Sequence, residues 1–246
     1  MEPIVELEHV DAGYGGKAVL SDVSFSVKRS EIFALLGGSG CGKTTLMKHM
    51  TGLNPVLAGR LAVAGEEWSA ASRARLCRRI GVMYQSGALF GSMTCLGNVM
   101  LPLDEFSPLS RRERKAKAME LLASVGLEDA AGKMPAEISG GMRKRVAIAR
   151  AMALEPDVVF LDEPGAGLDP LTASALDDLV LRLRAERGMT FIMVTHELDS
   201  IFATADRCAV FDAARRSMVA LGAPRWLADE CEDEFTRRLL NRGGKA

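Results

Sequence analysis

A glycine-rich run with the spacing of a phosphate-binding loop lies near the N-terminus. Residues 37–44, Gly-Gly-Ser-Gly-Cys-Gly-Lys-Thr, fit the pattern G-x-x-x-x-G-K-[ST] at every fixed position. They follow an apolar stretch, Ile32 to Leu36, that predicts a buried strand. Glycines let backbone N–H groups turn toward an anion, and the helix expected after the loop presents its positive N-terminus. Lys43 would reach the β- and γ-phosphates and the Thr44 hydroxyl would hold Mg²⁺, so the run indicates nucleotide binding.

Two adjacent carboxylates come at the end of a second apolar stretch. Residues 158–161, Val-Val-Phe-Leu, predict a buried strand that delivers Asp162 and Glu163 to the sheet edge where α/β proteins bind ligands. Asp162 would organise Mg²⁺ through its water shell, and Glu163 would polarise a water for in-line attack on the γ-phosphate. Such a pair alone is better explained as a solvated turn, but together with the phosphate loop it indicates hydrolysis.

The composition is that of a globular chain without a strong charge. The chain has 246 residues, of which 48% are hydrophobic, and its 31 basic and 32 acidic residues give a formal charge of −1. Because a near-neutral chain lacks the field that would hold it on nucleic acid or anionic lipid, we expect no nucleic-acid partner and membrane contact only through another protein. No apolar run approaches the ~20 residues of a membrane span, and the N-terminus lacks a signal-peptide pattern. We therefore expect the chain in the cytoplasm.

The spacing of cysteines and histidines excludes two classes of site. The five cysteines are scattered and form no C-x-x-C pair, which fits reduced thiols and offers neither a disulfide framework nor a zinc site. The three histidines are also too dispersed to predict a metal site.

The first half of the chain divides into a β-rich part and a helical part. Up to about residue 90 the sequence predicts strands, interrupted by one helix after Thr44. From Cys95 to Leu154 the pattern becomes helical. Ser110 and Glu113 form a capping box there, which marks the start of one helix.

The second half alternates between strands and helices and ends in a tail. The alternation expected of a parallel sheet covers residues 158–161, 172–187, 191–194 and a helix from about 197. Residues 229–246 predict a tail helix that begins with acidic residues and ends with arginines, among them Arg242, which suits the helix dipole.

A short sequence before the acidic strand resembles the signature of ATP-binding-cassette (ABC) ATPases. Residues 138–142, Ile-Ser-Gly-Gly-Met, are similar to the L-S-G-G-Q signature and occupy its expected place. The other elements of that family also occur in order. They are an aromatic that resembles the adenine-stacking residue (Tyr14), the Q-loop glutamine (Gln85), the D-loop (167–169, Gly-Leu-Asp) and the switch histidine (His196). The resemblance covers essentially the whole chain.

The resemblance implies an α/β fold, in which a P-loop NTPase core carries an N-terminal antiparallel β subdomain and an inserted α-helical subdomain. Residues 1–246 would form a single ABC ATPase domain. Its implied parts are a RecA-like core with the β subdomain (1–94 and 155–228), a helical insert with the signature (95–154) and a C-terminal tail helix (229–246).

The resemblance also implies the cofactors, ATP and Mg²⁺, and the residues that hold them. The implied catalytic residues are Glu163, His196 and Gln85. The implied Mg²⁺ ligands are Thr44, Gln85 and, through water, Asp162. The implied ATP-binding residues are Tyr14, Gly37, Gly38, Ser39, Gly40, Cys41, Gly42, Lys43, Thr44, Thr45, Ser139, Gly140 and Gly141.

The signature predicts a second anion site and therefore a dimer. Ser139 would begin a helix with basic residues at 143–145, so its hydroxyl, the amides of Gly140 and Gly141 and the helix N-terminus would bind phosphate. One chain would then carry two half-sites for one nucleotide. The resemblance implies that two copies, or two homologous chains, join head to tail, so that each signature closes on the phosphate loop of the other. We expect a second copy of this chain, in an ATP-dependent homodimer.

One departure from the usual signature bears on the cargo. Met142 replaces the usual Gln, and residues 84–90 with 138–145 look like the ATPase subunit of Mla-type phospholipid transporters, in which Met stands at this position. That resemblance implies an integral membrane permease, a periplasmic Mce-type lipid-binding subunit reached through it, and a place on the cytoplasmic face of the inner membrane. The alternatives are an ABC ATPase for another cargo, or a soluble ABC ATPase acting on ribosomes or DNA.

An apolar segment after Gln85 predicts the contact with the permease. Residues 88–90 and then Met93, Leu96 and 99–102 are unusually apolar for a link between a nucleotide-sensing loop and a helical insert. We expect part of this segment in the core and the rest in a groove that accepts a short permease helix.

Overall fold

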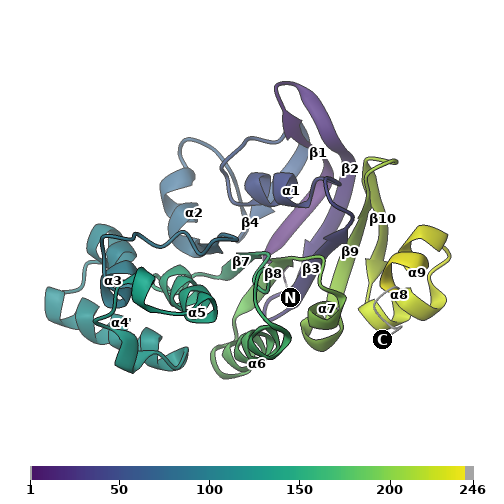
Figure 1. The fold of residues 1–246 in the computed structure, drawn as a ribbon. Coiled ribbons are helices and arrows are strands. Elements are labelled where there is room, and N and C mark those ends of the chain that lie inside the picture. The colour runs from purple at the N-terminus through teal and green to yellow at the C-terminus, as the bar shows by residue number, and fades with distance from the viewer. Residues whose placement is uncertain (1, 242–246) are drawn as a thin grey trace.

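The computed structural model describes residues 2–241, and the strands in this range form two sheets (Figure 1). The smaller sheet is antiparallel, has the order β2-β1-β4-β5 and belongs to the N-terminal part of the chain. Its strands are β1 (Val5–Tyr14), β2 (Lys17–Val27), β4 (Ala58–Val63) and β5 (Glu66–Glu67). The expected N-terminal antiparallel sheet is therefore confirmed.

The larger sheet has the order β10-β9-β3-β8-β7-β6. Its strands are β3 (Ile32–Gly37), β6 (Ile80–Met83), β7 (Val158–Asp162), β8 (Thr190–Val194), β9 (Arg207–Asp212) and β10 (Ser217–Gly222). All neighbours pair in parallel except β10, which is antiparallel to β9. Every residue of β3, β7 and β8 is buried, which explains their continuous apolar runs.

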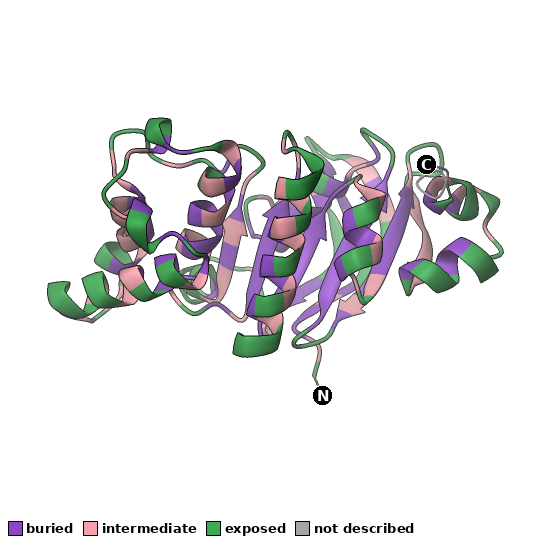
Figure 2. Cartoon of the chain, turned by 60° about the horizontal axis from the view of Figure 1, so that its bottom comes forward, coloured by how far each residue is buried: buried purple, intermediate pink, exposed green. Residues whose placement is uncertain are grey.

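Helices lie over the larger sheet, and the residues on their outer sides are exposed (Figure 2). The helices in the described range are α1 (Lys43–Met50), α2 (Arg73–Arg79), α3 (Cys95–Phe106), α4 (Arg111–Ser124), α5 (Gly140–Ala151), α6 (Pro170–Arg187), α7 (Leu198–Thr204), α8 (Pro224–Glu230) and α9 (Glu234–Leu240). The capping box at Ser110 and Glu113 is present at the start of α4. One apolar cluster lies between the two sheets and around α1. A second cluster contains residues of helices α3, α4, α5 and α6 and of the larger sheet.

The structure differs from the sequence-based expectation at two places. Helix α2 is a second interruption of the β-rich part, and a seven-residue helix with one buried residue, Leu76, has almost no apolar periodicity to reveal it. The tail is also not one helix. Cys231 is extended, with φ −64° and ψ 133°, and the Asp233 carboxylate accepts a hydrogen bond from the Thr236 amide, which starts a new helix. The expected end of the tail, with Arg242, lies outside the described residues.

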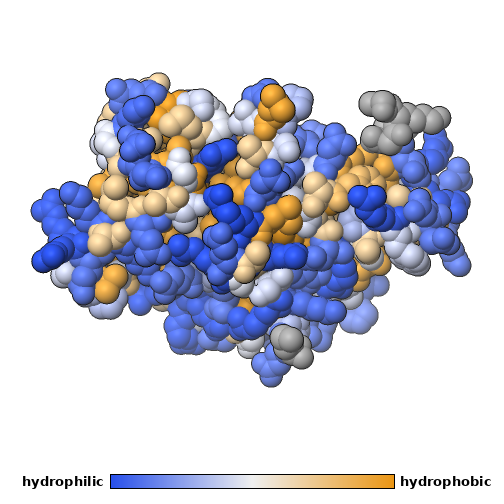
Figure 3. All heavy atoms as spheres, turned by 90° about the horizontal axis from the view of Figure 1, so that it is seen from below, coloured by the Kyte–Doolittle hydropathy of each residue, from blue (hydrophilic) through white to orange (hydrophobic). Residues whose placement is uncertain are grey.

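No helix of residues 2–241 is both long enough and apolar enough to cross a bilayer. On the face shown in Figure 3 the surface is mostly hydrophilic, and apolar atoms appear in separate patches.

Candidate nucleotide-binding site

Four parallel strands bring the expected catalytic groups to one edge of the larger sheet. The phosphate loop follows β3, Gln85 follows β6, Asp162 and Glu163 end β7, and His196 follows β8. Parallel strands place their carboxyl ends together, so residues more than 100 positions apart meet there. A cleft of about 690 Å³ opens at this edge.

The cleft brings together most, but not all, of the expected site residues. Those that line it are Gly37, Gly38, Ser39, Gly40, Gly42, Lys43, Thr44, Thr45, Gln85, Glu163 and His196. Four apolar residues complete its wall, namely Val19, Leu36, Leu198 and Leu239. Among the described residues, its lining does not include Tyr14, Cys41, Asp162, Ser139, Gly140 or Gly141.

The phosphate loop has the geometry that its sequence predicts. Gly42 precedes α1 with φ 103°, where a Cβ would also press on the side chain of Leu20. The Lys43 ammonium donates to the carbonyl oxygens of Gly37 at 2.8 Å and Gly38 at 3.1 Å. The loop therefore holds the Lys43 ammonium close to its backbone, at the place where phosphate charge would be neutralised.

The acidic pair is split between two environments. Glu163 faces the cleft, and His196 Nδ1 lies 3.0 Å from its Oε1 and 2.9 Å from its Oε2. The backbone of Glu163 has φ 48°, an uncommon conformation for a residue with a side chain and one that clusters at functional sites. The imidazole is thus placed to orient the carboxylate that we expect to act on water.

Asp162 is buried and suits a cation. Its exposed fraction is 8%, and within residues 2–241 its buried Oδ1 has no hydrogen-bond partner. Burial raises the pKa of Asp162, the Glu163 charge raises it further, and Lys48, Lys144 and Lys43 partly offset both effects. A hydrated Mg²⁺ would supply the missing partner to this carboxylate, so the residues present fit the expected ion.

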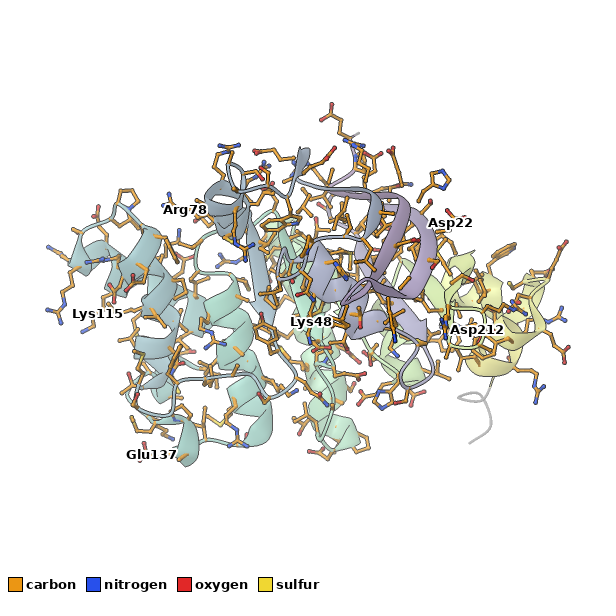
Figure 4. All side chains as sticks on the ribbon, turned by 90° about the horizontal axis from the view of Figure 1, so that it is seen from above. Asp22, Lys48, Arg78, Lys115, Glu137 and Asp212 are labelled. Carbon is orange, nitrogen blue, oxygen red and sulfur yellow. The ribbon has the colours of Figure 1, made fainter. Side chains whose placement is uncertain are left out.

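Tyr14 lies at the end of the β1–β2 hairpin, beside α1. Its side chain is 46% exposed, and the Lys48 ammonium lies 5.9 Å from its ring centre. Figure 4 labels Lys48 near the middle of the view. The exposed ring is available to stack on a base.

The signature residues begin α5, as expected, but one basic residue of this helix has another task. Ser139 caps α5, and its Oγ accepts a hydrogen bond from the Met142 amide at 3.2 Å. Lys144 is only 6% exposed and donates to the backbone carbonyls of Gln85 and Glu163, so it does not belong to the expected anion site. Burial lowers its pKa, and the nearby acidic residues oppose this shift. Lys144 lies five positions after Ser139 on α5, and there its side chain is turned toward the protein interior. The sequence alone did not show this.

Two further side chains hold the segment that follows Gln85. Arg150 on α5 donates to the carbonyls of Gly87 and Ala88, each at 2.7 Å. Asn98 on α3 is fully buried, accepts from the Phe90 amide at 2.8 Å and donates to the Phe90 carbonyl at 3.1 Å. Sequence reasoning missed these residues because their partners are backbone atoms, which leave no mark in the sequence.

The fold and the site define a nucleotide-binding protein of the phosphate-loop class. The model of the ABC transporter family matches residues 20–166, and the chain belongs to this family. Family membership agrees with the expected cofactors, ATP with Mg²⁺, and with the expected ATP hydrolysis.

Individual relatives come from more than one transport system. The chain is 42% identical over 204 residues to the methionine import ATP-binding protein MetN of Caulobacter vibrioides, which covers 82% of this chain and 61% of that protein. It is 37% identical over 227 residues to MlaF of Escherichia coli, the ATP-binding protein of an intermembrane phospholipid transport system, which covers 91% of this chain and 84% of that protein. The chain thus spans less than two thirds of the length of the first of these relatives.

Solved structures agree with the fold. CbiO1 from Clostridium perfringens, part of the ABC transporter complex CbiONQ, has a TM-score of 0.86 at 28% identity, which covers 98% of this chain and 96% of that one. The ATP-binding cassette MJ0796, solved as a dimer bound to ADP and Pi, has a TM-score of 0.79 at 28% identity over 89% of this chain and 98% of that one.

Proposed function

We propose that this chain hydrolyses ATP to power a membrane transporter. The observation that carries the proposal is the convergence of Lys43, Glu163 and His196 in one cleft, from the ends of three parallel strands. Lys43 binds the phosphates, with the amides of residues 37–42 and the Thr44 and Thr45 hydroxyls beside it. Glu163 takes the proton of the attacking water, and His196 holds Glu163 in place.

Three side chains would hold the Mg²⁺ that accompanies ATP. Thr44 and Gln85 both line the cleft, and the buried Asp162 carboxylate would act through the ion's water shell. The ion supplies charge neutralisation on the β- and γ-phosphates. Gln85 also connects the site to the apolar segment that follows it.

Two variants separate binding from hydrolysis. Lys43→Ala should abolish tight ATP binding, because Lys43 neutralises phosphate charge in the ground state and the transition state alike. Glu163→Gln should keep binding and lose turnover, because Glu163 acts only on the attacking water. Nucleotide binding and phosphate release measure the two effects, and rapid turnover in Glu163→Gln would remove Glu163 as the base.

The working unit is an ATP-dependent homodimer. Ser139, Gly140 and Gly141 lie outside the cleft of their own chain and would complete the cleft of a second copy. Leu171, at the start of α6, is 84% exposed, which fits a surface that a partner covers. Sizing Glu163→Gln with and without Mg-ATP tests this assembly: a dimer should appear only with nucleotide, and a tight dimer without it contradicts the proposal.

The cargo that we propose is phospholipid moved between the inner and outer membranes. One observation supports it over methionine: Met142 in the signature, the residue that the resemblance to Mla-type ATPase subunits implies at this position. The chain would then sit on the cytoplasmic face of the inner membrane, bound to a permease and through it to a periplasmic Mce-type subunit. Methionine import is the second candidate, since MetN of Caulobacter vibrioides is 42% identical.

Purification of the intact complex decides between the cargoes. The chain, solubilised from membranes with its permease, should transfer labelled phospholipid between vesicles when ATP is supplied. ATP-dependent uptake of labelled methionine without lipid transfer would instead establish the second candidate. Recovery without any integral membrane protein, but with ribosomes or DNA, would overturn the transport function.

Phe90 is the residue best placed to contact the permease. It is 50% exposed, whereas Leu89 packs partly against the core and Val99 is fully buried, so the apolar segment divides between surface and core. Phe90→Glu should keep nucleotide affinity, and it should lose co-purification with the permease and lose transport. Lys115→Glu on the exposed side of α4 serves as the control. Normal assembly of Phe90→Glu with its permease would exclude this contact.

A further inference from the structure

His49 is a buried histidine that none of the steps above uses. It lies in the last turn of α1, and its exposed fraction is 0%. Its Nε2 accepts a hydrogen bond from the Gly13 amide at 3.0 Å, and its Nδ1 lies 3.2 Å from the Asn54 carbonyl oxygen. An amide only donates and a carbonyl only accepts, so these partners require a neutral ring with its proton on Nδ1.

The Gly13 amide belongs to the end of the hairpin that carries Tyr14. Gly13 lies against the backbone of Lys17 and Ala18, and a Cβ at this position would collide with both. The ring of Tyr14 is 6.4 Å from the ring of His49 and is tilted by 37° to it. His49 therefore holds the residue before Tyr14 and lies beside the Tyr14 ring.

Helix α1 connects this contact directly to the phosphate loop. The helix begins at Lys43, whose ammonium lies in the loop, and ends at Met50, next to His49. Lys48, the neighbour of His49, holds its ammonium over the Tyr14 ring, 5.9 Å from the ring centre. One rigid element of eight residues thus sets both the place of the phosphates and the place of the exposed aromatic ring.

We infer that His49 is a positioning residue for the base of the nucleotide. It fixes the hairpin end at the distance from the phosphate loop at which Tyr14 stacks on adenine. The inference rests on the proposed stacking of adenine on Tyr14. Without the Nε2 acceptor the Gly13 amide is buried without a partner, and the hairpin end must move toward water to satisfy it.

Two substitutions at this position separate the contacts of the ring. Gln places a polar atom where Nε2 stands and can accept from the Gly13 amide, whereas Asn reaches only the Asn54 carbonyl. His49→Asn should weaken ATP binding about five- to tenfold, the cost of one buried hydrogen bond. His49→Gln should restore most of the affinity.

Inorganic tripolyphosphate, which has the phosphates and no base, serves as the second probe. His49→Asn should bind tripolyphosphate with Mg²⁺ as the unchanged protein does, and in turnover it should raise KM for ATP with little change in kcat. Equal losses for ATP and tripolyphosphate, or no loss for ATP, would overturn the role of His49. Thermal unfolding of each variant shows whether the fold is intact. A folded His49→Asn protein that loses ATP and tripolyphosphate affinity equally counts against the inference.

Tyr14→Ala shows which assumption has failed. It should weaken ATP more than tripolyphosphate if adenine stacks on this ring. If Tyr14→Ala weakens the binding of ATP and of tripolyphosphate equally, or changes neither, the stacking of adenine on Tyr14 is wrong. If Tyr14→Ala is selective and His49→Asn is not, the stacking stands and the positioning role of His49 is wrong.

Discussion

Replacement of Lys144 by methionine should slow hydrolysis more than it weakens ATP binding. The Lys144 ammonium is buried under the site and donates to the carbonyls of Gln85 and Glu163, the latter at 3.1 Å. It therefore ties the backbone of a proposed Mg²⁺ ligand to that of the proposed base. Methionine has a similar length but no donor, so Lys144→Met leaves both carbonyls without their charged partner.

The size of the effect follows from the two lost hydrogen bonds. A hydrogen bond to a charged group contributes about 1.5–3 kcal/mol, and removal of a buried cation returns part of this by ending its desolvation cost. The expected net loss in the free energy of unfolding is about 2 kcal/mol. A misplacement of about 1 Å at a reacting group costs roughly 100-fold in rate, so we expect kcat to fall by about 10- to 100-fold.

The assay compares kcat, KM and chemical denaturation for three variants and the unchanged protein. Lys115→Met is the matched control, because Figure 4 shows Lys115 on α4, far from the site, and its side chain is exposed. Lys144→Arg should recover part of the rate, since a guanidinium can reach the same carbonyls. A Lys144→Met protein that is destabilised but has unchanged kcat would refute the reasoning, because the lysine would then support the fold alone.

Two further predictions concern stability. Burial acts to raise the pKa of Asp157, but hydrogen bonds from Arg79 and Arg29 outweigh this effect and leave the pKa below its ordinary 3.8. The stability that these ion pairs contribute is therefore present above pH 3.8 and is lost as the pH falls through the lower pKa of the folded protein. The Asp157→Asn variant lacks this contribution. Its free energy of unfolding in urea, measured between about pH 5 and pH 2, should therefore depend less on pH than that of the unchanged protein. Gly81→Ala should lose roughly 2 kcal/mol in the same assay, because its Cβ would collide with the backbone carbonyl of Ala151, whereas Gly91→Ala has open space and should lose little.

Local patterns determined much of the candidate site in advance. The phosphate loop, its strand and its helix are contiguous, so the spacing of residues 37–44 was enough to predict the loop and the place of Lys43. The acidic pair could be placed because a continuous apolar run such as 158–161 implies a buried parallel strand with its end at the ligand edge. The Ser139 cap of α5 is likewise a local signal, and the structure contains it.

The tertiary structure decided which distant groups meet. The order β3-β8-β7-β6 places His196 beside Glu163, and nothing in the spacing of 33 residues between them gives that distance. Helix α2 and the break in the tail at Cys231 were missed because packing and caps, not apolar periodicity, support them.

The partners of buried polar side chains were also beyond the sequence. His49 meets the Gly13 amide across 36 residues, and Lys144 meets the Gln85 carbonyl across 59. Both partners are backbone groups, which every residue carries, so no residue type marks them. Only the packing of α1 against the hairpin and of α5 against the sheet chooses these contacts, because a buried polar atom must bond to whatever the fold brings within reach.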